Sequence, residues 1–305
     1  MNILNYLFQI FVCVNLIASC KKFGFFINTT KQLCLNSYMS KIIVTYADIC
    51  FEQAARNISD LIGLPLEYIT SNKQSVSPEA DYYLSFTDQG LVFMPLANNH
   101  GAIRCDFVSG IHRHRRNHGG GNGQMIAKAI GVSGKFFPKV LDLTAGLGSD
   151  GFVLASLGCS LNLLERNPIV FQLLKDGLDR AVIAAAEDIE LAQIMSRMSL
   201  SHTNSLDYLK KLSEHEYPDV IYIDPMFPPR KKSAQVKKEM QALHQIVGAD
   251  DDSAQILEHA LDKAVYRIVV KRPAHSDYLG MQKPSYSLEG KSTRYDIFAK
   301  QKLPK

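Results

Sequence analysis

The sequence lacks several features that would quickly assign it to a class. Its 305 residues contain no CxxC pair and no Cys/His cluster, so we expect no zinc site and free cysteines in a reducing cytosol. No internal repeat or low-complexity stretch is present. The hydrophobic share of 46% and the charged share of 21% are near globular averages, which argues against disordered, collagen-like and coiled-coil chains.

A run of apolar residues long enough to cross a membrane is also missing. Leu7 to Ala18 is shorter than the span of about 20 residues that a bilayer requires. It could be the core of a signal peptide, but no Lys or Arg precedes it. We expect residues 1–38 to be an N-terminal extension, either upstream of a start at Met39, which we favour, or signal-like. We therefore expect a cytoplasmic protein with no membrane partner.

The chain has no strong net charge. Its 34 basic and 30 acidic residues give +4, which by itself does not indicate a nucleic-acid partner. Without residues 1–38, which contain three Lys and no acid, the net charge is +1. The basic residues become informative because they cluster, at His112 to His118, at Arg230-Lys231-Lys232 and at Lys271-Arg272.

The hydrophobic pattern divides the chain in two. Residues 39–110 predict a small α+β domain, with a strand at 42–46, a helix at 48–61 and a hairpin from 82–86 to 91–94. Residues 111–305 alternate strands with helices, which is typical of a parallel sheet. The strands expected there are 140–143, 161–164, 219–223 and 267–270, the last ended by Lys271-Arg272-Pro273, followed by an antiparallel hairpin (285–288 and 294–298). The predicted helices are 125–130, 150–157, Pro168 towards Arg180, and 253–264.

Glycines and polar side chains follow the first two strands of the larger part. Gly146 and Gly148 would let the backbone approach a ligand, and the helix that begins at Ser149-Asp150 would offer unpaired N–H groups. Glu165, at the end of the next strand, can accept hydrogen bonds from the ribose of an adenosine ligand. A dehydrogenase would satisfy both features equally well.

A third strand is followed by Asp224-Pro225-Met226-Phe227-Pro228. The pattern resembles the D/N-P-P-F/Y motif of methyltransferases that modify exocyclic amines of bases. Such an amine is a poor nucleophile because its lone pair is delocalised into the ring. A carboxylate and a proline-fixed carbonyl can accept hydrogen bonds from its N–H groups, and Phe227 can stack on the extruded base.

From about Asn98 onward, some two thirds of the chain resembles the ribosomal RNA small subunit methyltransferase J family. The matching segments include 106–110 (DFVSG), 144–148 (TAGLG), 164–168 (LERNP), 224–228 (DPMFP) and 269–273 (VVKRP). The resemblance implies a Rossmann-like class I methyltransferase that uses S-adenosylmethionine to methylate the N2 amine of a guanine in 16S rRNA. The resemblance implies a cofactor site at Ser149, Asp150, Glu165, Arg166, Asn204, Ser205 and Asp224, to which the glycine turn adds Gly146 and Gly148.

Two departures from the family pattern fall in this site, Ser149 in place of a frequent Arg and Asn204 in place of Ser. Asn204 can also be read as the N-cap of a helix at 206–211.

The predicted catalytic residues are Asp224, Pro225 and Phe227, and the mechanism needs no metal. Two other functions stay open: a methyltransferase for adenine N6 in DNA, and a non-catalytic RNA-binding ribosome assembly factor. A nicotinamide dehydrogenase is disfavoured, because no catalytic His/Arg or Lys/Tyr set is evident.

The basic clusters predict contact with the phosphates of 16S rRNA or of the small ribosomal subunit. The residues expected to make it are Arg115, Arg116, Arg230, Lys231, Lys232, Lys271 and Arg272. Phosphate contacts supply affinity more than sequence choice.

Replacing Arg115, Arg116, Lys231 and Lys232 together should weaken RNA binding and flatten its salt dependence, because fewer counterions are then released. Titration of labelled rRNA at several salt concentrations measures both. Unchanged affinity and an unchanged salt slope would contradict the predicted contact.

Overall fold

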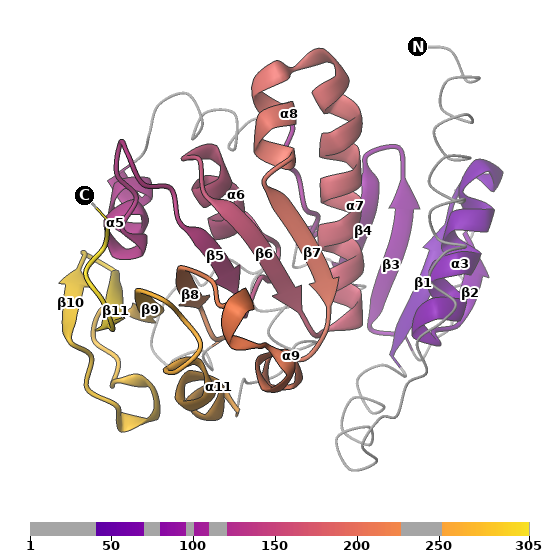
Figure 1. The fold of residues 1–305 in the computed structure, drawn as a ribbon. Helices are drawn as coiled ribbons and strands as arrows, with labels where there is room; N and C mark the ends of the chain where they lie inside the picture. Colours follow the sequence, from indigo (N-terminus) through magenta and orange to yellow (C-terminus); the bar gives the residue numbers. More distant parts are fainter. Residues whose placement is uncertain (1–40, 70–79, 96–100, 110–120, 227–251, 305) are drawn as a thin grey trace. The chain divides into compact units, whose positions relative to one another are not determined.

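The computed structural model describes residues 41–69, 80–95, 101–109, 121–226 and 252–304. The expected N-terminal extension, residues 1–38, therefore lies outside the described residues. Two sheets organise the rest of the chain (Figure 1).

The first sheet has four strands in the order β2-β1-β3-β4. β1 runs parallel to β2 and β3, while β3 and β4 form an antiparallel hairpin through a turn at Gly90. The elements are β1 (Ile42–Tyr46), the 3-10 turn η2 (Ile49–Phe51), α3 (Glu52–Ile62), β2 (Leu66–Tyr68), β3 (Tyr82–Thr87) and β4 (Gly90–Pro95). The strand, helix and hairpin expected in this region are confirmed.

The second sheet has seven strands in the order β10-β11-β9-β8-β5-β6-β7. Five neighbouring strands, from β9 to β7, are parallel, and β10 and β11 add the expected C-terminal antiparallel hairpin. The strands are β5 (Lys139–Asp142), β6 (Ser160–Glu165), β7 (Met198–His202), β8 (Val220–Ile223), β9 (Arg267–Pro273), β10 (Tyr286–Glu289) and β11 (Thr293–Ala299). The predicted α/β class is thus confirmed.

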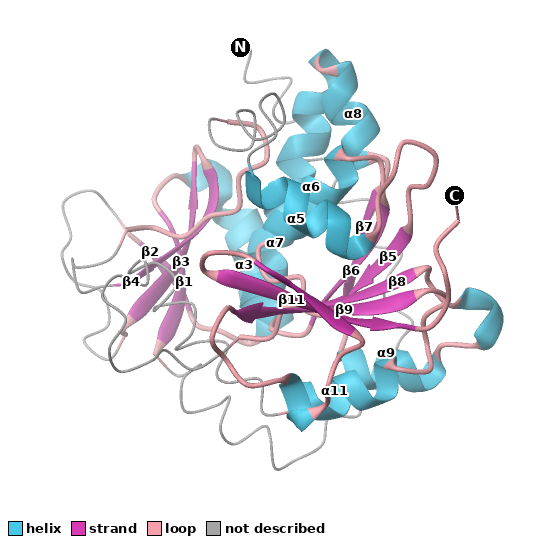
Figure 2. Cartoon of the chain, turned by 90° about the vertical axis from the view of Figure 1, so that its left-hand side faces the viewer, coloured by secondary structure: helices cyan, strands magenta, loops and turns pink. Residues whose placement is uncertain are grey.

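Helices cover both faces of this sheet, as Figure 2 shows. One face packs against α5 (Gly121–Ile130), α6 (Ser149–Ser156), α7 (Pro168–Ala184) and α8 (Ile189–Met195), with the turn η3 (Ala185–Glu187) between the last two. The other packs against α9 (Ser205–Lys211) and α11 (Ser253–Ala260). The turns η4 (Glu214–Glu216) and η5 (Leu279–Met281) complete the described elements. Strand residues alternate between the two cores: Val140 and Tyr222 face the first, Leu141 and Ile221 the second.

The predicted end of one strand is wrong. Lys271-Arg272-Pro273 was expected to stop the strand at Val270, but β9 continues to Pro273 because β11 pairs with it over its whole length. A proline is accommodated at the last position of a strand, where no further ladder bond is needed. The helix expected at 253–264 also ends earlier, at Ala260.

Within the described ranges, no helix is both long and apolar enough to cross a membrane. The same residues contain no group of three or more His, Cys, Asp and Glu side chains that could hold a metal ion. Cys50, Cys105 and Cys159 are free thiols, and burial raises the pKa of Cys159 to about 12.

Helix α7 of the larger sheet packs directly on β4 of the smaller one. Asp176 accepts hydrogen bonds from the backbone of Leu91 and from Arg180 Nε, the latter at 2.8 Å. Gly90, at φ +101°, lies so close to this pair that a Cβ would be 2.3 Å from Arg180 Nε. The division into domains at residue 110 stays a prediction, and this contact crosses it.

Gly90→Ala should lower the free energy of unfolding by about 2–4 kcal/mol, because backbone strain and a clash with Arg180 add. Gly63→Ala is the matched control: Gly63 also has a positive φ, +70°, but no atom lies within 4 Å of its would-be Cβ. The control should cost only about 1–2 kcal/mol. Urea unfolding measures both, and equal losses would show that the close approach at Gly90 contributes nothing.

Candidate active site

A cleft opens at the carboxyl ends of β5, β6 and β8. From β5 the sheet grows in two opposite directions, through β6 and β7 on one side and through β8 and β9 on the other. Open α/β sheets bind ligands at such a switch point. The cleft is lined by Leu143, Thr144, Gly146, Leu164, Glu165, Arg166, Ser205, Asp224, Met226 and Ile256. Segments about 80 residues apart in the sequence are thus brought to one edge of the sheet.

The two glycines of the first turn have different roles. Gly146 has φ +54°, and a Cβ built on it would meet no atom within 4 Å, so its cleft side is open to a ligand. Gly148 has φ +71° and precedes α6, and a Cβ there would lie 2.7 Å from Leu174 Cδ1. Gly146 leaves space for a ligand, whereas Gly148 lets α6 and α7 pack closely.

Glu165 holds the turn together from the end of β6. Its Oε2 accepts the Gly146 N–H at 2.9 Å and its Oε1 accepts the Asn167 N–H at 2.7 Å. The residue is only 7% exposed. A carboxylate offers about four acceptor positions, so both oxygens retain capacity for a ligand hydroxyl.

The other predicted cofactor residues connect neighbouring elements. Asn204 Oδ1 accepts the N–H groups of Leu206 and Asp207, which confirms the N-cap reading. Ser205 Oγ donates to the Leu143 carbonyl at 2.5 Å and so joins α9 to the glycine turn. Ser149, the first residue of α6, is exposed.

Arg166 is engaged by a carboxylate of another element. Its Nη1 lies 2.8 Å from both carboxylate oxygens of Asp252, which directly precedes α11. Asp252 is 8% exposed. This ion pair ties the end of β6 to α11, and Ile256 of that helix lines the cleft.

Asp224 is fixed from both sides. Its backbone N–H donates to Thr144 Oγ1 at 2.6 Å, which joins the loop after β8 to the loop after β5. Its carboxylate Oδ2 accepts from Lys271 Nζ at 2.8 Å. Pro225 is buried beside it, and Met226 lines the cleft. Phe227 lies outside the described residues.

The sequence pattern assigned Lys271 to contact with RNA phosphates, but in the structure its side chain bonds to carboxylates of this site. Its Nζ donates to Asp150 Oδ2 at 2.7 Å as well as to Asp224, and Tyr222 Oη donates to the same Asp150 oxygen at 2.6 Å. Although burial opposes it, the two carboxylates raise the pKa of Lys271 above its ordinary value. Strand alternation could have indicated this inward position from the sequence. Residues two apart in a strand share a face, so Lys271 lies on the same face as buried Val269, and Asp224 follows Tyr222 by two residues.

The comparisons with known proteins agree on one family. The SAM_MT family model of SAM-dependent methyltransferases matches residues 68–300. Ribosomal RNA small subunit methyltransferase J from Cellvibrio japonicus is 48% identical over 256 residues, which cover 83% of this chain and 96% of that protein. The chain belongs to this methyltransferase family.

A second relative and a solved structure support the membership. The protein of the same name from Pseudomonas aeruginosa is 48% identical over 254 residues, 83% of this chain and 92% of that one. A SAM-dependent methyltransferase from Neisseria gonorrhoeae is 33% identical and has a similar fold, with a TM-score of 0.62 over 85% of this chain and 95% of that chain. The Rossmann-like class I methyltransferase fold is therefore confirmed.

The residues present fit the S-adenosylmethionine of this family. The cofactor has ribose hydroxyls that need acceptors and a positive charge that favours nearby carboxylates. The cleft provides Glu165 at its lining, open space over Gly146, and the carboxylate of Asp224 at its end. The first turn of α6 adds Asp150.

A further acid lies beneath the site. Asp142, the last residue of β5, is 2% exposed, and its Oδ1 accepts the Thr144 N–H at 2.9 Å. Burial, together with the charges of Asp150, Asp224 and Glu165, raises the pKa of Asp142 to about 8. At neutral pH this carboxyl group therefore retains its proton.

The predicted RNA-binding residues divide into two groups. Arg115, Arg116, Arg230, Lys231 and Lys232 lie outside the described residues. Lys271 and Arg272 are described, and as successive residues of β9 they point to opposite faces of the sheet. Arg272 is 7% exposed and donates from Nη2 to the Asp277 carbonyl at 2.7 Å. RNA contact by these residues stays a prediction.

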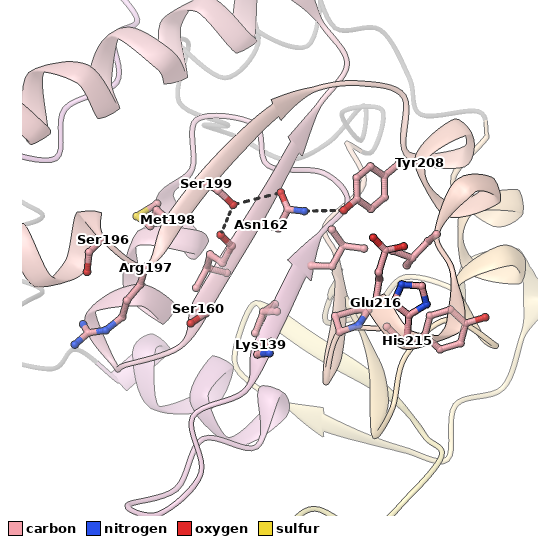
Figure 3. Close-up of a pocket in the computed structure, with 16 residues that line it drawn as sticks. Lys139, Ser160, Asn162, Ser196, Arg197, Met198, Ser199, Tyr208, His215 and Glu216 are labelled. Carbon is pink, nitrogen blue, oxygen red and sulfur yellow. Dashed lines mark hydrogen bonds between the residues drawn. The ribbon is translucent and has the colours of Figure 1, made fainter. Parts of the chain in front are cut away.

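A larger hollow of about 390 Å³ lies elsewhere, over the first residues of β5 and β6 (Figure 3). Its polar side chains bond within the lining of the hollow: Asn162 Nδ2 donates to Tyr208 Oη at 2.9 Å, and Ser199 Oγ donates to the backbone carbonyl of Leu161 at 3.0 Å. None of the predicted site residues that the structure describes lines this hollow. The predicted site therefore stays at the smaller cleft, at the opposite ends of the strands.

Asp142 should make the protein less stable as pH rises from about 4 to 8. The unfolded chain loses this proton near pH 4, whereas the folded chain keeps it until about pH 8. Asp142→Asn removes the titration, so relative to wild type its free energy of unfolding should gain up to about 1 kcal/mol per pH unit between pH 5 and 8. Urea unfolding at four pH values measures this gain.

Asp60→Asn, an exposed position in α3, is the control and should give a pH profile parallel to that of wild type. If the Asp142→Asn profile is parallel as well, the carboxyl group titrates normally and the argument from burial is wrong.

Proposed function

We propose that this methyltransferase transfers a methyl group from S-adenosylmethionine to the exocyclic N2 of one guanine in 16S rRNA, in the cytoplasm. Two lines support the substrate: the relatives are named ribosomal RNA small subunit methyltransferase J, and Asp224-Pro225-Met226 follows β8 beside the cofactor cleft. The position of Asp224 carries the proposal, because an amine-methylating enzyme needs a fixed hydrogen-bond acceptor there.

Positioning is the main catalytic task of the proposed reaction. The cofactor supplies a methyl group already activated by its sulfonium. The guanine N2 would form a bond to the methyl carbon while the carbon–sulfur bond breaks with its electron pair left on sulfur, and the proton lost from N2 would pass to water. Asp224 would accept a hydrogen bond from the amine N–H and stabilise the positive charge that develops on N2. Phe227 would stack on the base, with Pro225 fixing the turn.

The remaining roles are assigned by the elements that hold each residue. In the turn after β5, Gly148 would contribute its backbone while its Cα packs against Leu174, and Gly146, Ser149 and Asp150 would face the cofactor. Glu165 and Arg166 would do so from the end of β6, and Asn204 and Ser205 from the start of α9. Glu165 is the proposed acceptor for the ribose hydroxyls.

The partner would be 16S rRNA, either free or within the small ribosomal subunit. We propose that the predicted basic residues hold its phosphates around the cleft, and that no metal takes part. We also retain the proposed division into a small α+β domain, residues 39–110, and a methyltransferase domain, residues 111–305.

Asp224→Ala should leave the fold intact and lower methyl transfer by at least about a hundredfold, since the amine loses its acceptor. Circular dichroism and a tritiated-methyl assay on rRNA measure the two effects. Asp277→Ala is the control, an exposed acid just beyond the end of β9 at the same sheet edge, and should retain activity. Near-normal activity in Asp224→Ala would remove this residue from the mechanism.

The substrate is tested by offering labelled cofactor with 16S rRNA, small ribosomal subunits and duplex DNA, followed by mapping of the methylated nucleotide. N2-methylguanine in 16S rRNA supports the proposal. N6-methyladenine in DNA would replace it with the DNA enzyme, and cofactor binding without transfer to any substrate would favour a non-catalytic assembly factor.

A further inference from the structure

Lys271 joins two acids that the proposed function places on different sides of the reaction. Asp150, in the first turn of α6, belongs to the cofactor side. Asp224, after β8, belongs to the amine side. One ammonium group lies 2.7 Å from the first carboxylate and 2.8 Å from the second.

The surroundings of Lys271 restrict its side chain to this position. Tyr295 of β11 is its cross-strand neighbour, and Tyr222 of β8 donates to the Asp150 oxygen that Lys271 also contacts. Both tyrosines are buried, at 4% and 1% exposure. Burial, with the nearby carboxylates, raises the pKa of Tyr222 and of Tyr295, so both rings stay neutral.

The charges at the cleft show why a cation is needed there. Asp224 and Glu165 line the cleft, Asp150 shares the Lys271 ammonium group with Asp224, and all three acids are close enough to Asp142 to raise its pKa. Charges in a partly buried site interact more strongly than in water. Without Lys271, two acids bonded to one ammonium group would repel each other, and Asp224 would lose the contact that sets the direction of its carboxylate.

The charge of Lys271 also bears on the reaction. During methyl transfer the positive charge moves from sulfur to the amine nitrogen. Carboxylates that stabilise the sulfonium lower the energy of the ground state, whereas a carboxylate at the amine lowers that of the transition state. Lys271 contacts one acid on each side, so its charge weakens the attraction of Asp150 for the sulfonium while its hydrogen bond fixes the Asp224 carboxylate in place for the amine.

We propose that Lys271 is a positioning residue that ties Asp150 to Asp224 and offsets the negative charge that the cofactor's sulfonium experiences. The inference rests on the proposed function for the identity of the amine. The charge effect of Lys271 does not depend on that function, because cofactor binding alone measures it. It assigns Lys271 a task different from contact with RNA phosphates.

The decisive measurement compares S-adenosylmethionine, which carries a sulfonium, with S-adenosylhomocysteine, whose sulfur is neutral. In Lys271→Met the ratio of the two dissociation constants should shift about threefold or more in favour of S-adenosylmethionine, because a nearby positive charge is removed. Lys271→Arg keeps the charge and should give a ratio close to that of wild type. A structural defect would change both affinities equally and leave the ratio constant.

Lys300→Met is the matched control. Lys300 is exposed and follows Ala299, which pairs with Arg267 at the start of β9, so it lies at the opposite edge of the same sheet. Calorimetric titration of each variant with each ligand gives the ratios. If Lys271→Met lowers the melting temperature by more than about 10 °C, Lys271→Gln replaces it with the same expectation.

On rRNA, kcat of Lys271→Met should fall at least tenfold. An unchanged ligand ratio overturns the inference, and so does an unchanged kcat. A loss of RNA affinity with a constant ratio would also overturn it, and would assign Lys271 to the RNA. If wild type methylates no rRNA, the proposed function fails, while the ligand ratio still decides the charge effect of Lys271.

Discussion

The site depends on one half-buried cation placed between two carboxylates. Lys271 comes from β9, Asp150 from the helix after β5, and Asp224 from the end of β8. Each acid alone at a half-buried sheet edge would be costly to ionise, and two of them adjacent would be costlier. The ammonium group makes the pair tolerable, so that carboxylates can face a cationic cofactor and a reacting amine from fixed positions.

Main-chain hydrogen bonds complete the same arrangement. Thr144 Oγ1 accepts from the Asp224 N–H, Glu165 accepts from Gly146, and Ser205 donates to the Leu143 carbonyl. These bonds join the loops after β5, β6 and β8 to one another and to α9. Hydrogen bonds of this kind hold the ends of the strands in fixed positions, and positioning is the main contribution a protein can make to methyl transfer.

Much of this was predictable from local patterns. The alternation of strands and helices predicted the parallel sheet, and the two short strand patterns at 285–288 and 294–298 predicted the C-terminal hairpin, because both depend on short-range periodicity. Gly146, Glu165 and Asp224 could be placed at the site because each follows a hydrophobic strand, and parallel strands end at one edge. The end of β9 was predicted wrongly because only its partner β11, which begins 20 residues after β9 ends, keeps Lys271 to Pro273 extended.

The class of fold, the family and the residues at the strand ends follow from periodicity and motif, so the order of amino acids is enough to predict them. What those side chains contact depends on how distant segments pack together. Arg166 pairs with Asp252 and Asn204 caps α9, while Lys271 turns inward to two carboxylates and Arg272 turns to the other face. Charge pairing and burial depend on residues far apart in the chain, so a cluster of basic letters cannot tell a phosphate contact from an internal counter-ion.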